Sequence, residues 1–336
     1  MRHGYVLGID AGGSKTHALI ADLEGRVVGW GQSGPGNWEG VGLDGAAAAY
    51  AQAVEAALDV AGIPRNALIA AGYALAGLDW ESDRDRLTPV VTRLGVPGPF
   101  ILVNDAFGAL RAGSVDGCGV VVIVGTGSTV AGRNRRGDTF RTFGLGMVWG
   151  DFHGATGLVW EATRAIGHAW IGRGPATALT DAFVQAYGAT GLLDLVERVS
   201  RGAAPRPNGR LAPLVFATAD AGDEVACRIV RQAGEDLGQT AAAVVRKLDL
   251  GAEPFDLVLA GGVFRSRNTL LIETLASQVR LEAPAVRVVL LEAPPVAGSV
   301  LLAFDAAGLP TPPALRERLL AEAHHRFDML QRGTLQ

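Results

Sequence analysis

The sequence predicts an α/β fold built from two related halves. Over residues 5–103, apolar runs of strand length alternate with Ala-rich helical stretches in the order strand, strand, strand, helix, strand, helix, strand. The opening pattern, an apolar strand followed by a glycine turn and further strands, recurs at residues 119–138. We interpret this recurrence as an internal duplication. With 49% hydrophobic residues among 336, the chain can bury sizeable cores.

Charge and composition indicate small-molecule partners. The chain has 30 basic and 34 acidic residues and a net charge of -4, so it lacks the broad positive field that attracts nucleic acid or an anionic membrane. No apolar run reaches the roughly 18 to 20 residues of a membrane span, and residues 1–3 lead into a strand instead of a signal peptide. We therefore expect a cytoplasmic protein without nucleic-acid or membrane partners. Cys118 and Cys227 are solitary, which favours buried apolar roles over a disulfide or a metal cluster.

The first half is expected to open with three antiparallel strands. Residues 5–9 form an apolar run, residues 16–23 alternate as a second strand, and a turn at Glu24 and Gly25 leads to a third strand at 26–30. Periodicity and buried runs then predict a helix at 42–61, a strand at 68–76, a helix at 83–94, a strand at 100–103 and a helix at 107–112.

The turn between the first two strands is a candidate phosphate-binding site, within Gly-Ile-Asp-Ala-Gly-Gly-Ser-Lys-Thr at residues 8–16. Gly12 and Gly13 can adopt positive φ and have no side chain in the way, so successive backbone N–H groups can point at one bound anion. Asp10, at the strand end, can hold a divalent metal through its water shell. The segment misses the Walker spacing by one residue, and no helix follows it as a Rossmann fingerprint requires. An ordinary hairpin turn, with Lys15 in solvent, is the alternative.

Two further places in the first half are candidate substrate contacts. Asn37 and Trp38 lie in a turn-rich loop, where the amide can bind a sugar hydroxyl and the indole can stack on the sugar; a loop cap and a satellite core aromatic are the alternative. Asp105 follows the strand at 100–103 and opens a helix, so its carboxylate is expected in the crevice where α/β sheets bind ligands. A plain helix N-cap is the alternative there.

The second half is expected to repeat the first with added helices. A strand at 119–124 leads into Gly125, Thr126, Gly127 and Ser128, then a strand at 129–132 and a hairpin tip at 135–138. Helical patterns cover 157–171, 176–187, 191–200, 223–248, 296–307 and 314–332, with strands at 255–260 and 286–291 and a flexible loop at 202–209. Gly261 and Gly262 end a strand before a helix from about residue 266. A flat nucleoside ring can lie against such a glycine pair; a plain strand-to-helix turn is the alternative.

Together these segments resemble the BadF/BadG-type ATPase and eukaryotic-type N-acetylglucosamine kinase family of the actin, hexokinase and Hsp70 superfold. The resemblance is carried, in the family's order and spacing, by residues 8–16, Val-Asn-Asp-Ala at 103–106, Gly-Thr-Gly-Ser at 125–128 and Leu-Ala-Gly-Gly-Val-Phe at 259–264. It implies two duplicated ribonuclease-H-like (actin/hexokinase-like) domains around a nucleotide-binding cleft. We place an N-terminal domain at 1–113 and a C-terminal domain at 114–336.

The resemblance implies an ATP-dependent kinase that phosphorylates N-acetylglucosamine or glucosamine at O6. Asp105 would be the general base that accepts the proton of the sugar hydroxyl, and Asp10 would position Mg²⁺ through water. The nucleotide would be bound by Asp10, Gly12, Gly13, Ser14, Lys15, Thr16, Gly125, Thr126, Gly127, Ser128, Gly261 and Gly262. The sugar would be bound by Asn37, Trp38, Gly77, Asp105 and Asp151. We also expect a homodimer.

The sequence departs from the family in one segment. Gly144-Leu145-Gly146 stands where the family has Gly-Trp-Gly, and Phe152-His153 follows Gly150-Asp151 where the family has Glu-Gly. The departure bears on the sugar more than on ATP: either Phe152 and His153 reshape the sugar pocket, or Asp151 has lost its usual support. His153 itself either contacts substrate or is an ordinary polar loop residue.

Two other functions stay open at this point. The same family includes ATPases that activate 2-hydroxyacyl-CoA dehydratases or benzoyl-CoA reductase through an iron–sulfur cluster, but lone Cys118 in a hydrophobic strand is a poor cluster ligand. A sugar-sensing regulator on the same fold would need a DNA-binding module, and no helix-turn-helix is expected before the first strand.

Overall fold

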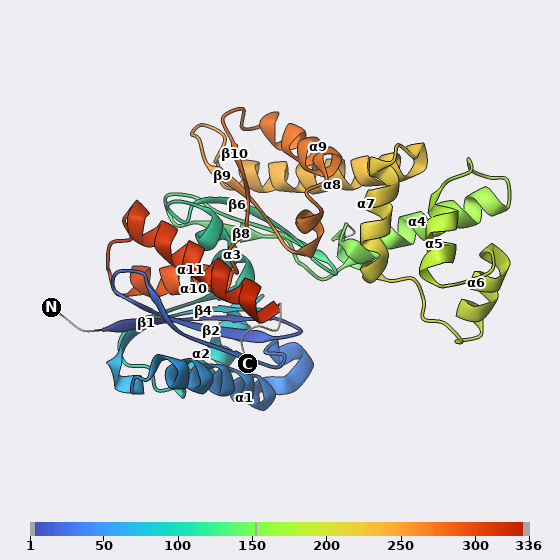
Figure 1. The fold of residues 1–336 in the computed structure, drawn as a ribbon. Coiled ribbons are helices and arrows are strands. Elements are labelled where there is room, and N and C mark those ends of the chain that lie inside the picture. The colour runs from blue at the N-terminus through green and yellow to red at the C-terminus, as the bar shows by residue number, and fades with distance from the viewer. Residues whose placement is uncertain (1–3, 152, 332–336) are drawn as a thin grey trace. The chain divides into compact units, whose positions relative to one another are not determined.

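The computed structural model describes residues 4–151 and 153–331, which fold into two compact units. The first unit comprises Met1–Val121 with Val289–Gln336, and the second comprises Val122–Val288. Each unit is a layered α/β structure (Figure 1). This division differs from the single boundary expected between residues 113 and 114, because the last two helices belong to the first unit. Residues 1–3, Phe152 and residue 332, which entered the sequence predictions, lie outside the described residues.

A mixed five-stranded sheet forms the centre of the first unit, in the order β3-β2-β1-β4-β5. Strand β1 pairs antiparallel with β2 and parallel with β4, and β5 runs parallel to β4. The strands are β1 (Tyr5–Ala11), β2 (Thr16–Asp22), β3 (Val27–Ser33), β4 (Leu68–Leu75) and β5 (Phe100–Asn104). All five were predicted, and so were the antiparallel pairings of the first three.

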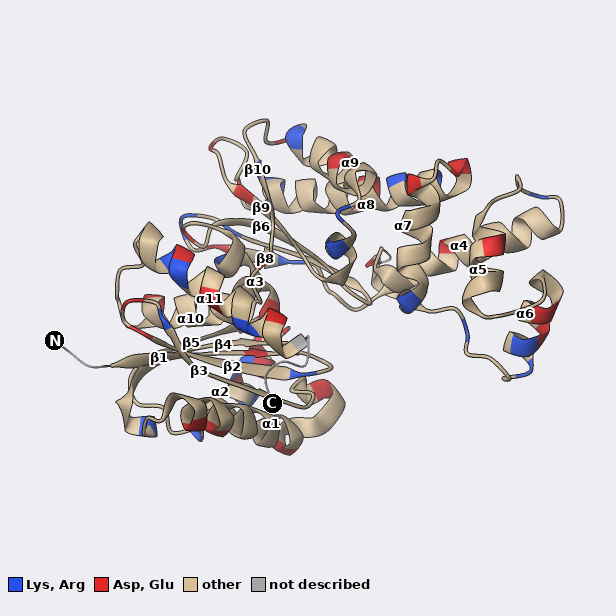
Figure 2. Cartoon of the chain, in the orientation of Figure 1, with Lys and Arg blue, Asp and Glu red and all other residues tan. Residues whose placement is uncertain are grey.

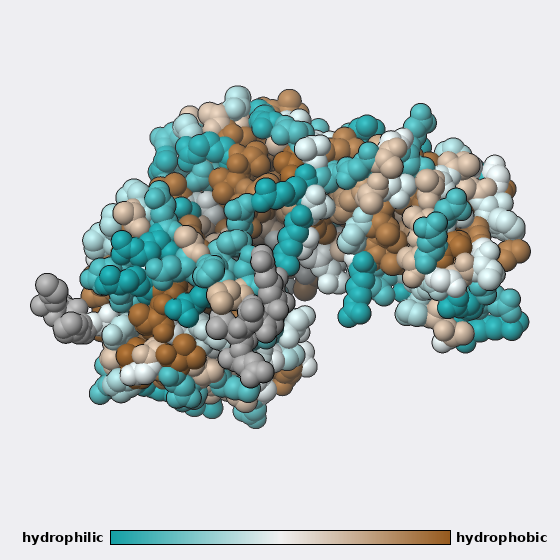
Figure 3. Space-filling view, in the orientation of Figure 1, coloured by the Kyte–Doolittle hydropathy of each residue, from teal (hydrophilic) through white to brown (hydrophobic). Residues whose placement is uncertain are grey.

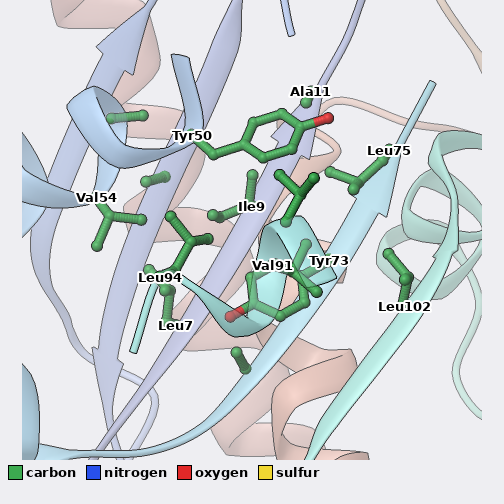
Figure 4. Close-up of a cluster of buried hydrophobic side chains, with 14 of the residues drawn as sticks. Leu7, Ile9, Ala11, Tyr50, Val54, Tyr73, Leu75, Val91, Leu94 and Leu102 are labelled. Carbon is green, nitrogen blue, oxygen red and sulfur yellow. The ribbon is translucent and has the colours of Figure 1, made fainter. Parts of the chain in front are cut away.

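Helices α1 (Trp38–Ala61) and α2 (Glu81–Thr92) cover one face of this sheet, and the short η1 (Arg65–Ala67) connects α1 to β4. Successive side chains of a strand point to opposite faces, so Leu7 and Ile9 of β1 point into this core. There they join Tyr50 of α1 and Val91 of α2 in one buried cluster (Figure 4). Helix α1 starts earlier than predicted and contains a kink at Gly42, where φ is 72°.

Helices α3 (Asp105–Gly113), α10 (Val296–Ala306) and α11 (Pro313–Gln331) belong to the other layer. Helix α10 lies directly against the sheet because the strands beneath it carry glycines. A Cβ atom on Gly8 would lie 2.4 Å from the backbone nitrogen of Val300, and one on Gly72 would lie 2.0 Å from the carbonyl oxygen of Ser299. This close packing of helix on sheet joins residues 289–336 to the first unit.

The second sheet repeats the topology of the first. Its order, β10-β9-β6-β7-β8, corresponds strand for strand to β5-β4-β1-β2-β3. The strands are β6 (Gly119–Val124), β7 (Ser128–Arg133), β8 (Thr139–Arg141), β9 (Asp256–Ala260) and β10 (Arg287–Leu290). The internal duplication predicted from the sequence pattern is therefore confirmed by strand order.

The helices of the second unit are mostly those expected from the sequence. They are α4 (Ala155–Trp170), α5 (Leu179–Ala186), α6 (Leu192–Ser200), α7 (Ala212–Asp220), α8 (Glu224–Lys247) and α9 (Thr269–Arg280), with short 3-10 turns η2 (Met147–Trp149), η3 (Gly209–Leu211) and η4 (Gly262–Ser266). Helix α7 was not predicted. The helix expected from about residue 266 begins three residues later, where the side chain of Asn268 caps α9 by accepting from the backbone N–H of Leu271.

Acidic and basic residues are interspersed along the outer elements (Figure 2). Figure 3 shows that hydrophilic residues cover much of one face, with smaller hydrophobic areas between them. Within residues 4–151 and 153–331, no helix has both the length and the apolar character that a membrane span needs.

Candidate functional site

The first glycine turn joins β1 to β2 and leaves open space around its glycines. The turn closes with a hydrogen bond from the backbone N–H of Gly12 to the carbonyl of Lys15 at 3.0 Å. This four-residue turn reverses the chain without left-handed backbone at Gly12 or Gly13, so the positive φ that is open to glycine is not used here. A Cβ atom on Gly13 would meet no atom within 4 Å, and one on Gly12 would meet only the Lys15 carbonyl, at 3.7 Å. Glycine here leaves room that a phosphate group could fill.

The loop that follows β3 is attached to this turn. The backbone N–H groups of Gly36 and Asn37 donate to the carbonyl of Gly12 at 3.0 and 3.2 Å. Thr16, an expected nucleotide contact, is fully buried, and its hydroxyl donates to the carbonyl of Gly34 at 3.0 Å. The hydroxyl of Thr16 therefore holds the loop that carries Asn37 beside the glycine turn.

Asp10 lies at the carboxyl end of β1 and is coupled electrostatically to Asp105. Burial is the largest cause that raises the pKa of Asp10, to about 7; the negative charge of Asp105 also raises it, and the Lys15 ammonium opposes the shift. Two carboxylates that disfavour each other's ionisation are stabilised by a cation placed near them. This pair therefore suits a divalent metal ion held through water.

Asp105 occupies the first helical position of α3. The N-cap is Asn104, whose side-chain oxygen accepts from the backbone N–H of Ala106 at 3.1 Å. The alternative that Asp105 itself is the N-cap is therefore wrong, because the residue before it already has this role. The positive end of the helix dipole favours a carboxylate at this position.

Asn37, Trp38 and Gly77, which were expected to contribute to one sugar pocket, lie together, and we call these three residues the sugar wall. The indole N–H of Trp38 donates to the carbonyl of Gly77 at 2.6 Å, and a Cβ atom on Gly77 would lie 2.4 Å from Oδ1 of Asn37. The guanidinium of Arg86 lies 5.2 Å from the centroid of the Trp38 ring. The local roles considered for Asn37 and Trp38 are also present, since Asn37 caps α1 and Trp38 packs against the core.

The second glycine turn, between β6 and β7, has the same open character as the first. Gly125 donates its N–H to the carbonyl of Gly127 at 2.9 Å, and a Cβ atom on either glycine would meet nothing within 4 Å. Helix α4 starts against this turn, because the N–H of Ala155 donates to the carbonyl of Gly125 at 2.8 Å. Gly154 permits this contact, since a Cβ atom there would lie 2.3 Å from the carbonyl oxygen of Thr126.

Gly261 and Gly262 follow β9 and have different physical roles. Gly261 has a φ of 101°, and a Cβ atom there would lie 2.4 Å from the carbonyl oxygen of Val124, the last residue of β6. Its backbone therefore requires glycine. A Cβ atom on Gly262 would meet nothing within 4 Å, which leaves room for a ligand at the start of η4.

The segment that departs from the family pattern is held inside the second unit. The carboxylate of Asp151 accepts from the backbone N–H of Leu145 at 2.9 Å. Nε2 of His153 lies 2.6 Å from Oδ2 of Asp236 in α8. Burial lowers the pKa of His153, against the opposing charges of Asp236 and Glu161. His153 is thus a partner of α8 as well as a loop residue.

Each unit brings together its own part of the predicted site. The first unit assembles the turn at 12–15 with Asp10, Asp105 and the wall made by Asn37, Trp38 and Gly77. The second unit assembles the turn at 125–128 with Gly261 and Gly262. Within residues 4–151 and 153–331, no group of three or more His, Cys, Asp and Glu could hold a metal directly. The residues present nevertheless fit ATP and Mg²⁺, because open glycines leave room for phosphates and the acidic pair favours a cation.

The side chains that fix the loop after β4 were not predicted from the sequence. Asp83, which is 2% exposed, accepts from the backbone N–H groups of Asp79 and Trp80 at 3.0 and 2.8 Å. The side-chain amide of Asn104 donates to Oδ1 of Asp79 at 3.0 Å. The sequence signal for the contacts of Asp83 was an acidic residue at the third position of a helix, from which its side chain can accept from the backbone N–H of the N-cap residue, here Trp80.

Known proteins resemble this chain over most of its length. The model of the BadF/BadG/BcrA/BcrD ATPase family matches residues 7–303. An N-acetylmuramic acid/N-acetylglucosamine kinase of Clostridium acetobutylicum is 29% identical over 300 residues, which cover 89% of this chain and 98% of the relative. An N-acetyl-D-glucosamine kinase of Dictyostelium discoideum is 29% identical over 311 residues, which cover 89% of this chain and 97% of the relative.

A solved structure shares the fold at lower identity. It is a ROK family glucokinase from Streptomyces griseus in complex with glucose and AMPPNP, with a TM-score of 0.56 and 19% identity, and the match covers 91% of this chain and 100% of that one. The fold is therefore the actin/hexokinase-like α/β fold predicted from the sequence. Because the family model spans most of the chain, this protein belongs to the BadF/BadG/BcrA/BcrD ATPase family.

Proposed function

We propose that this protein is an ATP-dependent sugar kinase that phosphorylates an amino sugar, with Asp105 as its general base. Family membership supports the use of ATP. Relatives named as N-acetylglucosamine kinases, matched over nearly their whole length, support the sugar as acceptor.

The observation that carries the proposal is the coupling of Asp10 to Asp105 beside an open glycine turn. Phosphoryl transfer requires in-line placement, positive charge on the phosphates and a carboxylate near the attacking oxygen, and little covalent help from the protein. Bound Mg²⁺ would supply positive charge at the phosphates of ATP, with Asp10 holding it through water. Asp105 would accept the proton of the attacking hydroxyl at the positive end of α3.

The glycine segments would bind the nucleotide. The phosphates would be held by backbone N–H groups and side chains of Gly12, Gly13, Ser14, Lys15, Gly125, Thr126, Gly127 and Ser128. Gly261 and Gly262 would lie against adenosine. Thr16 would act indirectly in this scheme, because its hydroxyl already donates to the carbonyl of Gly34.

The sugar would be N-acetylglucosamine or glucosamine, phosphorylated at O6, the primary hydroxyl of the ring. Asn37, Trp38, Gly77 and Asp151 would bind it, with the indole face of Trp38 packed on the sugar. The expected homodimer is also part of the proposal, and light scattering of the purified protein measures it directly.

A substrate screen tests this proposal. Purified protein is incubated with ATP, Mg²⁺ and glucosamine, N-acetylglucosamine, N-acetylmannosamine or glucose, and ADP release is measured against a reaction without sugar. We expect sugar-dependent ADP release that is fastest with an amino sugar, and a 6-phosphate in the ³¹P NMR spectrum of the product. ADP release that no sugar stimulates would refute the kinase, and a product phosphorylated elsewhere on the ring would refute O6 alone.

A further inference from the structure

The loop between β4 and α2 contacts both the proposed sugar wall and Asn104, the residue that precedes the proposed base. At one end, the carbonyl of Gly77 accepts from the indole of Trp38 at 2.6 Å. At the other end, Asp83 accepts from the backbone N–H groups of Asp79 and Trp80. The loop is therefore anchored on both sides of Asp79, and this residue is held in place by the backbone.

The side chain of Asn104 connects Asp79 to the start of α3. Its Oδ1 accepts from the Nδ2 amide of Asn104 at 3.0 Å, and Oδ1 of the same Asn104 accepts from the N–H of Ala106 at 3.1 Å. Asn104 is only 6% exposed. Its two hydrogen bonds therefore join the loop at Asp79 to the first turn of the helix that begins with Asp105.

The chemistry of these partners fixes the orientation of Asn104. An ionised carboxylate can only accept hydrogen bonds, so it requires the NH₂ end of the amide to face Asp79. The oxygen end must then face the N–H of Ala106, which is the orientation that caps α3.

We propose that Asp79 is a positioning residue that sets the carboxylate of Asp105 relative to the sugar wall through the amide of Asn104. This inference rests on the proposed function and deepens it, because it assigns a role to a residue that does not itself accept the proton. A displacement of about 1 Å at a reacting group costs up to about a hundredfold in rate. Loss of the Asp79 contact is therefore expected to lower kcat more than it changes the affinity for either substrate.

The test compares three variants with the wild-type enzyme in the same coupled assay. Asp79→Ala removes the acceptor, Asp79→Asn keeps an acceptor oxygen of the same reach, and Asp85→Ala changes an exposed aspartate of α2 as the matched control. We expect Asp79→Ala to lower kcat at least about tenfold with the KM values for ATP and sugar within about threefold of wild type. Asp79→Asn should recover most of kcat, and Asp85→Ala should match wild type.

The outcomes separate this inference from the proposed function. A wild-type enzyme that phosphorylates no sugar refutes both. An active wild-type enzyme with an Asp79→Ala variant equal to Asp85→Ala, or changed only in the KM for the sugar, refutes the positioning role alone. So does a loss of kcat that Asp79→Asn does not reverse. If Asp79→Ala does not fold, Asp79→Ser, whose hydroxyl is too short to reach Asn104, takes its place with the same expected loss.

Discussion

The charge of Asp10, which is half-buried, is expected to destabilise the metal-free protein, and an uncharged residue at this position should restore that stability. The pKa of Asp10 is raised in the folded protein from 3.8 to about 7, first by burial and second by Asp105. Below pH 3.8 the carboxyl is protonated in both the folded and the unfolded chain and costs nothing. As the pH rises toward 7, the unfolded chain loses this proton while the folded protein keeps it, so stability falls with rising pH.

The size of this effect follows from the shift itself. Each pKa unit corresponds to 1.36 kcal/mol, so the cost reaches about 4 kcal/mol above pH 7 and is about 2 kcal/mol at pH 5. Asp10→Asn removes the charge and keeps the shape. In a unit of this size, about 4 kcal/mol corresponds to a rise in the melting temperature of about 10 °C at pH 8.

The assay is thermal unfolding by circular dichroism in a buffer with EDTA, at pH 5 and at pH 8. We expect Asp10→Asn to melt above wild type at both pH values, with the larger difference at pH 8, and to have lost kinase activity. Asp85→Asn, at an exposed position of α2, is the control and should melt with wild type at both. A variant that melts at or below wild type at pH 8, or a difference that does not grow with pH, would refute the reasoning.

Two further predictions concern packing and a buried histidine. Gly72→Ala should destabilise the protein by about 3 kcal/mol, because its Cβ would lie 2.0 Å from the carbonyl of Ser299; Gly167→Ala, which meets no atom within 4 Å inside α4, should stabilise by about 0.5 to 1 kcal/mol. Urea unfolding measures both, and equal effects would contradict the close packing of α10. Burial, helped by Lys15, lowers the pKa of His17 to about 4, so stability present above pH 6.5 should fall by about 3 kcal/mol as the pH drops toward 4. In His17→Gln this loss should be absent between pH 7 and 5, and an unchanged pH dependence would exclude His17 as its source.

The strands and glycine turns could be predicted because their signals are local. The alternation at residues 16–23 and the glycines that end the strands at 5–9 and 119–124 each describe a hairpin by themselves. Their repetition in the same order was enough to predict the duplicated topology. The resemblance to the family then indicated which of these turns are candidate nucleotide-binding segments.

The contacts of α10 could not be predicted, because they are non-local. Gly8 and Gly72 look like weak positions within their strands, and only the packed structure shows that the backbone of α10 lies against them. The N-terminal and C-terminal parts of the chain are therefore joined by contacts that no local pattern records. Helix α7 was missed for another reason, since its nine residues, rich in alanine, follow a Pro-rich loop and carry no polar N-cap.

Within the site, residue types were easier to predict than their partners. Asp105 was correctly expected at the start of a helix, but the assignment of the N-cap depended on whether Asn104 or Asp105 had extended backbone. Thr16 belongs to the segment predicted to bind phosphate, yet its hydroxyl donates to the carbonyl of Gly34 on a different loop. Such hydrogen bonds are set by tertiary packing, which the sequence does not display.

The most direct measurement of the central claim is the rate of sugar-dependent ADP formation by Asp105→Asn. If Asp105 is the general base, the variant should lose about a hundredfold to ten-thousandfold in kcat while its Kd for ATP, measured by calorimetry, stays near that of wild type. Asp85→Asn should retain full activity. An Asp105→Asn enzyme that phosphorylates the sugar at close to the wild-type rate would contradict the account.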